Sequence, residues 1–354
     1  MQTRKLQQVG GGTYTVSIPK AWADEHALEA GMELHLYTHA DGSVVVRSAE
    51  TDGGDLAAAE IRPDGSDPDR VRRALRSAHA VGFETVRLVP PESFTTDQRR
   101  AARSAVRGMV GTDVLAESEE SVTVKHLLDA GTVSVRQSVL QLQHTALSVH
   151  RRGTAALADG DAAAHDRLRD RGEEAERLAG MVTRHFTRSL VSFAEVDRLG
   201  VSRPELFASC ATARALADVA DQGVGLARVA ERLDADLPEA VGAELREVGE
   251  ATRSVVADAT TAALDGTDAE AAHAALDDCE AALASVEALD CALFDADRTP
   301  VEDPRAAAAL ARALDGIGRT AERGGAIADV ALQAAMRAEH TDHHPGRETA
   351  DASG

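Results

Sequence analysis

The sequence contains very little lysine. Only three of its 38 basic residues are lysines (Lys5, Lys20 and Lys125), whereas 59 acidic residues give the chain a formal net charge of −21. A surface this acidic repels phosphate backbones, so the composition excludes a broad nucleic-acid-binding face and a basic membrane anchor. Carboxylates retain water and cations in concentrated salt, while each lysine stem adds apolar surface. The composition therefore predicts a halophilic protein.

Cysteines and long hydrophobic runs are scarce as well. The three cysteines, Cys210, Cys279 and Cys291, form no C-x-x-C pair, and we expect them to be small buried residues in a reducing cytoplasm. No segment has the ~20 consecutive apolar residues of a membrane span. No hydrophobic signal core follows the N-terminus. We therefore expect a cytoplasmic protein without membrane insertion.

What the sequence does contain divides it into segments of different character. With 354 residues, of which 44% are apolar, the chain is long enough for two or three globular domains. Residues 1–50 are rich in Gly, Val and Thr, and their short alternating runs are bounded by turn signals. They predict a small β-rich domain with strands within 13–18, 33–37 and 43–47 and a short helix within 19–26.

Residues 56–126 alternate between strand-like and helix-like patterns. The expected order is β-α-β-α-β-β, a small mixed α/β domain, with Thr95 as the N-cap of its second helix. The strands are expected at 59–62, 83–89, 113–117 and 121–125, and the helices at 68–81 and 96–110.

From Leu127 onward only helical patterns occur, in six stretches of about 25–30 residues that repeat apolar residues at 3-4 spacing. Such spacing is typical of helices packed nearly parallel. The breaks group the helices into two three-helix bundles, 127–233 and 238–340, followed by a loose tail, 341–354. The predicted fold class is multidomain α+β, mainly α.

The charge is divided unevenly between these segments. Residues 204–354 hold 30 acids against 12 arginines and no lysine, a net charge of −18. Residues 1–50 hold six acids against four bases and include two of the three lysines. Contact with DNA is therefore expected, if anywhere, in the first 50 residues.

The N-terminal segment resembles the SpoVT-AbrB swapped-hairpin family. The resemblance covers about 48 residues and rests on the Ile18-Pro-Lys20 step, the Leu28-x-x-Gly-x-x-Leu34 spacing and the run Asp41-Gly-Ser-Val-Val-Val46. It implies half of a β-barrel that a second copy completes, and hence a homodimer formed through this domain. Members of this family bind DNA or serve only as dimerisers, and both alternatives stay open here.

Three basic residues flank this segment: Arg4, Lys5 and Lys20. A dimer doubles them to six positive groups, which could contact the phosphates of promoter DNA. The alternative is that these side chains only aid solubility.

Residues 127–340 resemble the PhoU family, whose two repeated three-helix bundles regulate phosphate uptake. The repeat appears in Arg214-Ala-Leu-Ala-Asp-Val-Ala-Asp221 and in Arg312-Ala-Leu-Asp-Gly-Ile-Gly-Arg319, which resemble the family signature Leu-Glu-Arg-Ile-Gly-Asp. The resemblance implies a non-enzymatic regulator that docks on a phosphate ABC transporter ATPase or a signalling protein. The combined architecture implies a second alternative, a phosphate-responsive DNA-binding transcription regulator.

The same signature carries the family's Glu/Asp-x-x-x-Asp metal pattern, which implies a divalent or ferric metal ion. Here the candidate ligands are Asp218, Asp221 and Asp315, but Ala217 and Arg319 replace the other carboxylates, so each copy keeps one of two. The alternative is a solvated stripe in which Asp218 and Asp221 pair with Arg214. The sequence contains no nucleophile motif, no HExxH and only one Glu-x-x-His, so we expect no enzymatic activity.

Overall fold

The computed structural model describes residues 3–10, 12–38, 43–48, 54–65, 67–233, 237–293, 301 and 303–341. The chain divides into two units, Met1–Asp55 and Leu56–Gly354, which are described separately. In the part that is described, no helix combines the length and the apolar character that a membrane span needs.

The first unit consists of two hairpins and a short helix. Its elements are β1 (Gln7–Val9), β2 (Thr13–Thr15), α1 (Lys20–Glu25), β3 (His35–Thr38) and β4 (Val44–Arg47). Strand β1 pairs antiparallel with β2, and β3 pairs antiparallel with β4. The sequence predicted the other four elements but missed β1, because Gln7-Gln-Val9 is too short and polar to show alternation. No residue of α1 is buried within the single chain.

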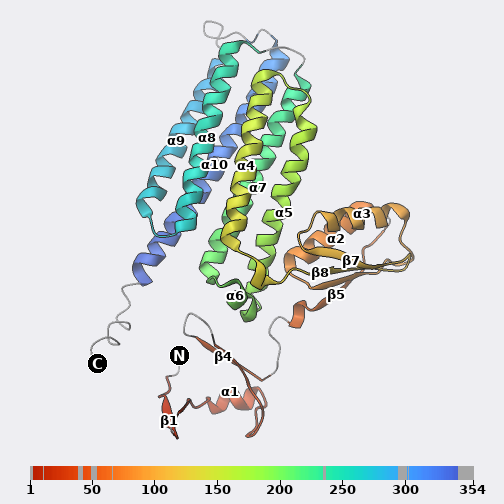
Figure 1. Ribbon diagram of the computed structural model, residues 1–354, viewed down its shortest axis with the longest axis vertical. Helices are drawn as coiled ribbons and strands as arrows, with labels where there is room; N and C mark the ends of the chain where they lie inside the picture. The colour runs from red at the N-terminus through yellow and green to blue at the C-terminus, as the bar shows by residue number, and fades with distance from the viewer. Residues whose placement is uncertain are drawn as a thin grey trace. The chain divides into compact units, whose positions relative to one another are not determined.

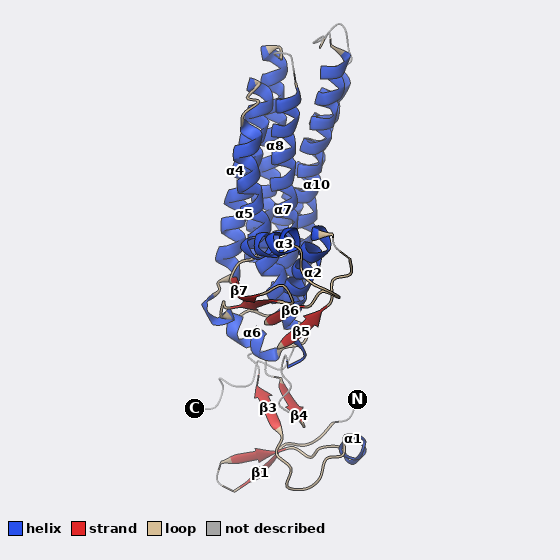
Figure 2. Cartoon of the chain, turned by 90° about the vertical axis from the view of Figure 1, so that its right-hand side faces the viewer, coloured by secondary structure: helices blue, strands red, loops and turns tan. Residues whose placement is uncertain are grey.

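The second unit begins with a four-stranded sheet in the strand order β5-β6-β8-β7. Strands β5 and β6 are parallel, and the other pairs are antiparallel. Helices α2 and α3 lie on one face of this sheet (Figure 2). The elements are the 3-10 turn η1 (Gly54–Leu56), β5 (Ala58–Ile61), α2 (Pro68–Val81), β6 (Thr85–Leu88), α3 (Thr96–Arg107), β7 (Thr112–Glu117) and β8 (Val122–His126).

Local signals set the limits of these two helices. Asp67 caps α2, which ends at Gly82 in the left-handed region at φ 109°. Thr95 and Gln98 form a reciprocal capping box at the start of α3, as the sequence predicted for Thr95. The predicted β-α-β-α-β-β order is confirmed. Helix α3 stops at Arg107 rather than at 110, since Gly108 ends it.

Six long helices follow and lie side by side (Figure 1). The first three are α4, α5 and α7, with the short α6 inserted before α7, and the second three are α8, α9 and α10. Their bounds, after the 3-10 turn η2 (Ala130–Thr132), are α4 (Val135–Asp159), α5 (Ala164–Ser189), α6 (Phe193–Leu199), α7 (Arg203–Arg232), α8 (Glu239–Asp265), α9 (Ala269–Ala292) and α10 (Pro304–Thr341). The predicted fold class, multidomain α+β and mainly α, is confirmed.

The two sets of three helices share one apolar interior. A single cluster of buried residues includes Val139 of α4, Ala213 of α7, Val256 of α8 and Ala331 of α10. A second cluster also joins α4, α7, α8 and α10. The sets are therefore fused through four helices, while α5 and α9 flank these helices and also contribute buried residues to both clusters (Figure 1).

Two further helix predictions need correction, and one prediction falls outside the described residues. The first long helix begins at Val135 rather than at about 127, because Asp129 caps the turn η2 and Ser134 caps the helix itself. The sequence also missed α6, a seven-residue helix between Ser192 and Gly200. The predicted loose tail beyond residue 341 lies outside the described residues.

Candidate functional site

A group of buried polar side chains lies near the C-terminal end of α5. Met181, Arg184, His185 and Arg188 follow one another at the i, i+3, i+4, i+7 spacing of a single helix face, and all four are buried. Arg184 is 0% exposed and His185 is 2% exposed. Charged side chains are rarely buried without partners. The contacts of these buried residues therefore indicate the role of this face of α5.

Arg184 is held by the end of α2. Its Nη1 donates to the carbonyl oxygen of His79 at 2.9 Å, and its Nη2 donates to the carbonyl oxygen of Phe83 at 2.9 Å. A cation at a helix C-terminus satisfies free carbonyl groups and interacts favourably with the helix dipole. Among the described residues, no carboxylate lies within ion-pair distance of Arg184. Burial and the neighbouring Arg188 lower the pKa of Arg184 to about 10.

Arg188, one turn further along, links three segments. Its Nη1 donates to the carbonyl oxygen of Gly82 at 2.6 Å, its Nη2 pairs with Glu84 at 3.1 Å, and its Nε pairs with Glu195 of α6 at 3.0 Å. A Cβ on Gly82 would overlap the Arg188 side chain, so glycine is needed there for space as well as for its positive φ.

Glu195 connects the arginine to the histidine. It is 3% exposed and also accepts a hydrogen bond from His185 Nδ1 at 2.6 Å. Burial alone would raise the pKa of Glu195, but the hydrogen bond from His185 and the charge of Arg188 together lower it. We call Arg184, His185, Arg188 and Glu195 the α5 polar cluster.

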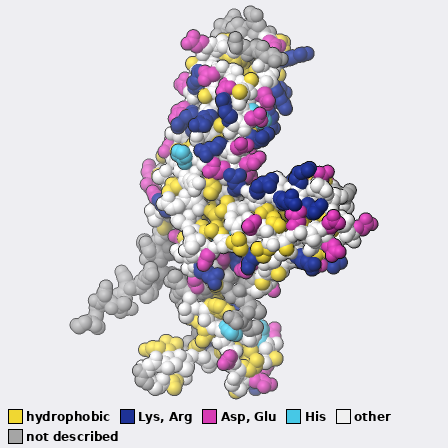
Figure 3. All heavy atoms as spheres, turned by 45° about the vertical axis from the view of Figure 1, so that its right-hand side comes forward, with side chains coloured by type: hydrophobic (Ala, Val, Ile, Leu, Met, Phe, Trp, Pro, Cys, Tyr) yellow, Lys and Arg dark blue, Asp and Glu magenta, His cyan; other side chains and the backbone are white. Residues whose placement is uncertain are grey.

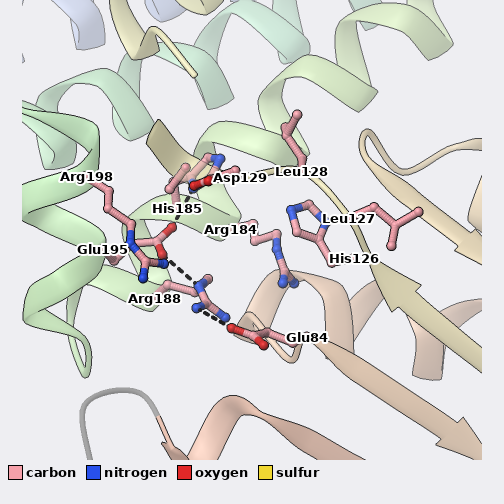
Figure 4. A pocket seen from close by; sticks show the side chains of 11 residues that line it. Glu84, His126, Leu127, Leu128, Asp129, Arg184, His185, Arg188, Glu195 and Arg198 are labelled. Carbon is pink, nitrogen blue, oxygen red and sulfur yellow. Dashed lines mark hydrogen bonds and ion pairs between the residues drawn. The ribbon is translucent and has the colours of Figure 1, made fainter. Parts of the chain in front are cut away.

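A cavity of about 190 Å³ opens beside the α5 polar cluster, between α5, α6 and the end of β8 (Figure 4). We call it the junction cavity. Its polar lining consists of three arginines, two histidines and three carboxylates: Arg184, Arg188, Arg198, His126, His185, Glu84, Asp129 and Glu195.

Several buried nitrogen atoms at the junction cavity have no hydrogen-bond partner. They are Arg184 Nε, His126 Nε2 and His185 Nε2, and His79 Nε2 lies just behind them. Burial and then the charge of Arg184 lower the pKa of His79 to about 4 and that of His126 to about 3. Both rings are therefore neutral at pH 7. The arrangement has hydrogen-bonding capacity to spare, which suits the binding of a polar ligand.

A family model matches the N-terminal segment, and a solved structure is similar over a larger share of the chain. Residues 7–53 match the family model described as "Antidote-toxin recognition MazE, bacterial antitoxin". This match confirms a MazE/AbrB-like domain at the N-terminus. It covers much less than half of the chain. Among solved structures, PhoU from Pseudomonas aeruginosa is similar at a TM-score of 0.45 and 18% identity, over 57% of this chain and 96% of that chain. No curated protein matches the chain.

The candidate DNA-binding residues all belong to the first unit. Arg4 and Lys5 precede β1, and Lys20 begins α1. All three are exposed, as contact with a phosphate backbone requires.

The candidate metal ligands are placed differently from one another. Asp218 pairs with Arg323 of α10 at 2.9 Å, so its ion-pair partner lies on another helix and is not the predicted Arg214. Burial and the charge of Asp218 raise the pKa of Asp221. Asp315 is exposed on α10, where its carbonyl oxygen accepts from Arg319 Nε at 3.3 Å. In the described ranges no three His, Cys, Asp or Glu side chains gather as a metal site requires. Burial and the charges of Asp221 and Asp218 raise the pKa of Glu176 on α5, but within the described ranges these carboxylates do not converge as a metal site.

Two cysteine predictions hold and one does not. Cys210 and Cys279 are buried, as expected, whereas Cys291 near the end of α9 is exposed.

The α5 polar cluster itself was missed by sequence reasoning. The available signal was the spacing of Arg184, His185 and Arg188 in line with Met181, but arginines are ordinarily read as solvent-facing.

Proposed function

We propose that this protein is a non-enzymatic cytoplasmic regulator of phosphate uptake and phosphate homeostasis. Its helical bundles would dock on a phosphate transporter ATPase or a signalling protein. The observation that supports this proposal is that residues 135–341 form two successive sets of three long helices, the architecture that the resemblance to PhoU implies. The degenerate acidic signatures play no part in it.

The first unit would join two copies of the chain. Its exposed apolar side chains are too many for a finished core in so small a unit, and they include Leu6, Val9, Tyr14, Leu36 and Val44. Hydrophobic side chains also cover much of the visible surface of its described part in Figure 3. A second copy that exchanges hairpins would cover them, which supports a homodimer.

The uptake proposal is tested in cells by deleting the gene and measuring phosphate uptake in phosphate-rich medium. Deletion should change the uptake rate, and the full-length chain should restore it. Uptake indistinguishable from that of the parent strain at both low and high phosphate would contradict the proposal. A chain without residues 1–55 tests the dimer separately, because it should be monomeric in molar KCl.

A second function, phosphate-responsive transcription regulation, is favoured by the exposed Arg4, Lys5 and Lys20. Neutralising all three with glutamine should abolish a promoter shift in molar KCl, because binding weakens with every basic group that no longer contacts a phosphate. The matched control neutralises three exposed arginines of the second unit, Arg152, Arg169 and Arg232. A shift that survives in the first variant, or is lost in both, would rule out these residues as the DNA contact.

A further inference from the structure

We propose that the junction cavity is a binding site for a small tetrahedral oxyanion. The choice of inorganic phosphate as the probe rests on the proposed function, whereas the need for an anion follows from the cavity itself. Four properties point to an anion: the charge of Arg184, the unpartnered nitrogen atoms, the engagement of the carboxylates and the size of the cavity.

Among the described residues no carboxylate lies within ion-pair distance of Arg184, and the charges of Glu195 and Glu84 act on it only from farther away. This guanidinium is fully buried, and its two hydrogen bonds from Nη1 and Nη2 go to neutral main-chain carbonyls. A buried cation without a paired negative charge is costly, because protein stabilises it less well than water does. An anion in the adjoining cavity would bring a negative charge closer to this guanidinium.

The unpartnered nitrogen atoms belong to residues that line the cavity. Arg184, His126 and His185 border the same space (Figure 4), and each has one buried side-chain nitrogen without a partner. Arg184 Nε is a donor at neutral pH. His126 Nε2 is a donor in the tautomer whose Nδ1 accepts from Thr112. His185 Nδ1 already donates to Glu195, so its Nε2 donates only when the ring is protonated. A tetrahedral oxyanion offers several acceptor oxygens at once and would satisfy these groups together.

The carboxylates of the lining argue against a cation in the same place. Both oxygens of Glu195 are used, one by His185 and one by Arg188. Glu84 Oε1 also binds Arg188, and Asp129 Oδ1 accepts from the main-chain nitrogen of Gly131 at 3.0 Å. Four of the six carboxylate oxygens of the lining thus already have partners, which leaves less capacity for a cation.

The size of the cavity limits the ligand. A volume of about 190 Å³ equals roughly six water molecules in the liquid. It is smaller than the ~300–1,000 Å³ of pockets that enclose larger organic ligands. Phosphate or sulfate with a few waters fits this volume. Glu84 and Arg198 are exposed, so the ligand can exchange without unfolding.

An occupied site would connect two parts of the second unit. His126 belongs to the sheet, Arg184 and His185 to α5, and Arg198 to α6. A single anion that contacts all of them would strengthen the attachment of the α/β part to the helices. Such a site would let the phosphate level alter the surface that the helices present to a partner.

The experiment measures binding of inorganic phosphate to the full-length protein by equilibrium dialysis in molar KCl, with sulfate in a parallel arm. We expect saturable binding of one anion per chain. Equal binding of sulfate supports the oxyanion site and shows that it does not select phosphate. Absence of saturable binding of either ion, including the case in which chloride fills the cavity, would overturn the proposal.

Variants locate the site. Arg184→Met should weaken phosphate binding about ten-fold or more, the effect of losing one charge-assisted hydrogen bond. The matched control is Arg253→Met, which removes another buried arginine, on α8, that does not line the cavity, and it should leave affinity unchanged. Because Arg184→Met risks misfolding, Arg198→Gln provides a test at an exposed lining residue, with Arg232→Gln as its control.

The outcomes separate this inference from the proposed function. If affinity is the same in R184M and R198Q as in the parent, the anion does not bind in the junction cavity. If gene deletion alters uptake while the protein binds no oxyanion, the cavity proposal fails and the regulator proposal stands. If binding is saturable but deletion leaves uptake unchanged, the regulator proposal fails and the cavity proposal stands.

Discussion

Helices α5 and α9 occupy the same position in the chain order of the two three-helix sets, yet they bury different kinds of residue. Helix α5 buries Arg184, His185, Arg188 and Ser189 beside its small apolar side chains. The buried residues of α9 are Ala, Val, Leu and one Cys without exception. Helix α9 carries six acids and no Lys or Arg, whereas α5 has five acids and six arginines.

The difference follows from what covers each helix. Helix α5 packs against α2 and α6, whose main-chain carbonyls and Glu195 provide the partners that buried arginines require. Five of the six acids of α9 are exposed to solvent, and only Asp290 is partly buried. The second helix of a three-helix set can thus either pack only through apolar residues or line a polar site. Which of the two it does depends on the elements that cover it.

The largest expected effect comes from breaking the α5 polar cluster with Glu195→Ala. Removal of this carboxylate leaves Arg188 and His185 without their buried partner, so we expect the free energy of unfolding to fall by about 3–5 kcal/mol. The control on α9 is Glu280→Ala, an exposed site where the change should stay within about 0.5 kcal/mol. Urea unfolding in molar KCl measures both. Equal effects would mean that the two helices are energetically alike.

Glycines that end helices next to α5 and α9 allow a second comparison. At Gly82, alanine must adopt positive φ and also overlaps Arg188, so we expect a loss of about 2–4 kcal/mol. Gly266, just before α9, also has positive φ, but the nearest side-chain atom to an added Cβ is at 3.9 Å, so Gly266→Ala should cost about 1–2 kcal/mol. Thermal unfolding would contradict this interpretation if the two variants were equally destabilised.

The pH dependence of stability should reveal the buried, neutral His79. The folded-state pKa of His79 is about 4, below the ~6.5 of the unfolded chain, so the unfolded state binds more protons between these values. The stability that neutral His79 contributes is therefore present above pH 6.5 and is lost as the pH falls towards 4. Between pH 7 and pH 5 this loss is about 2 kcal/mol. In His79→Gln the fall in unfolding free energy should be smaller by that amount, and an unchanged slope would disprove the assignment.

The smallest effects are expected for the acidic signatures of α7 and α10, the third helices of the two sets. Asp218 and Arg323 form an ion pair in which both side chains are about half exposed (48% and 47%). Asp218→Asn and Asp315→Asn should each change unfolding free energy by less than about 1 kcal/mol. Elemental analysis of untagged protein should find less than one iron or zinc per chain. Several metal ions per chain that are lost in these variants would restore the metal hypothesis.

Much of the fold was predictable because its signals are local. Ser202, capped reciprocally with Glu205, starts α7 where the sequence places a break. The apolar spacing within α7 and α8 marks the faces that are in fact buried. The short pieces escaped prediction: β1 has three residues and α6 has seven, too few for a period to be recognised.

The candidate site was not predictable in the same way. The residues that hold Arg184 lie more than 100 positions earlier in the sequence, at His79 and Phe83. No local pattern in α5 indicates those partners. The acids singled out from the resemblance, by contrast, were easy to find but do not form a cluster in the described residues.

The sequence by itself determined the acidic, lysine-poor surface, the order of elements and the near-neutral N-terminal segment, because composition, caps and periodicity depend on neighbouring residues. Only the tertiary structure decided which charges are buried. Whether an arginine faces solvent or a cavity depends on the carbonyls and carboxylates that distant elements bring to it, and burial is stable only where those partners are present.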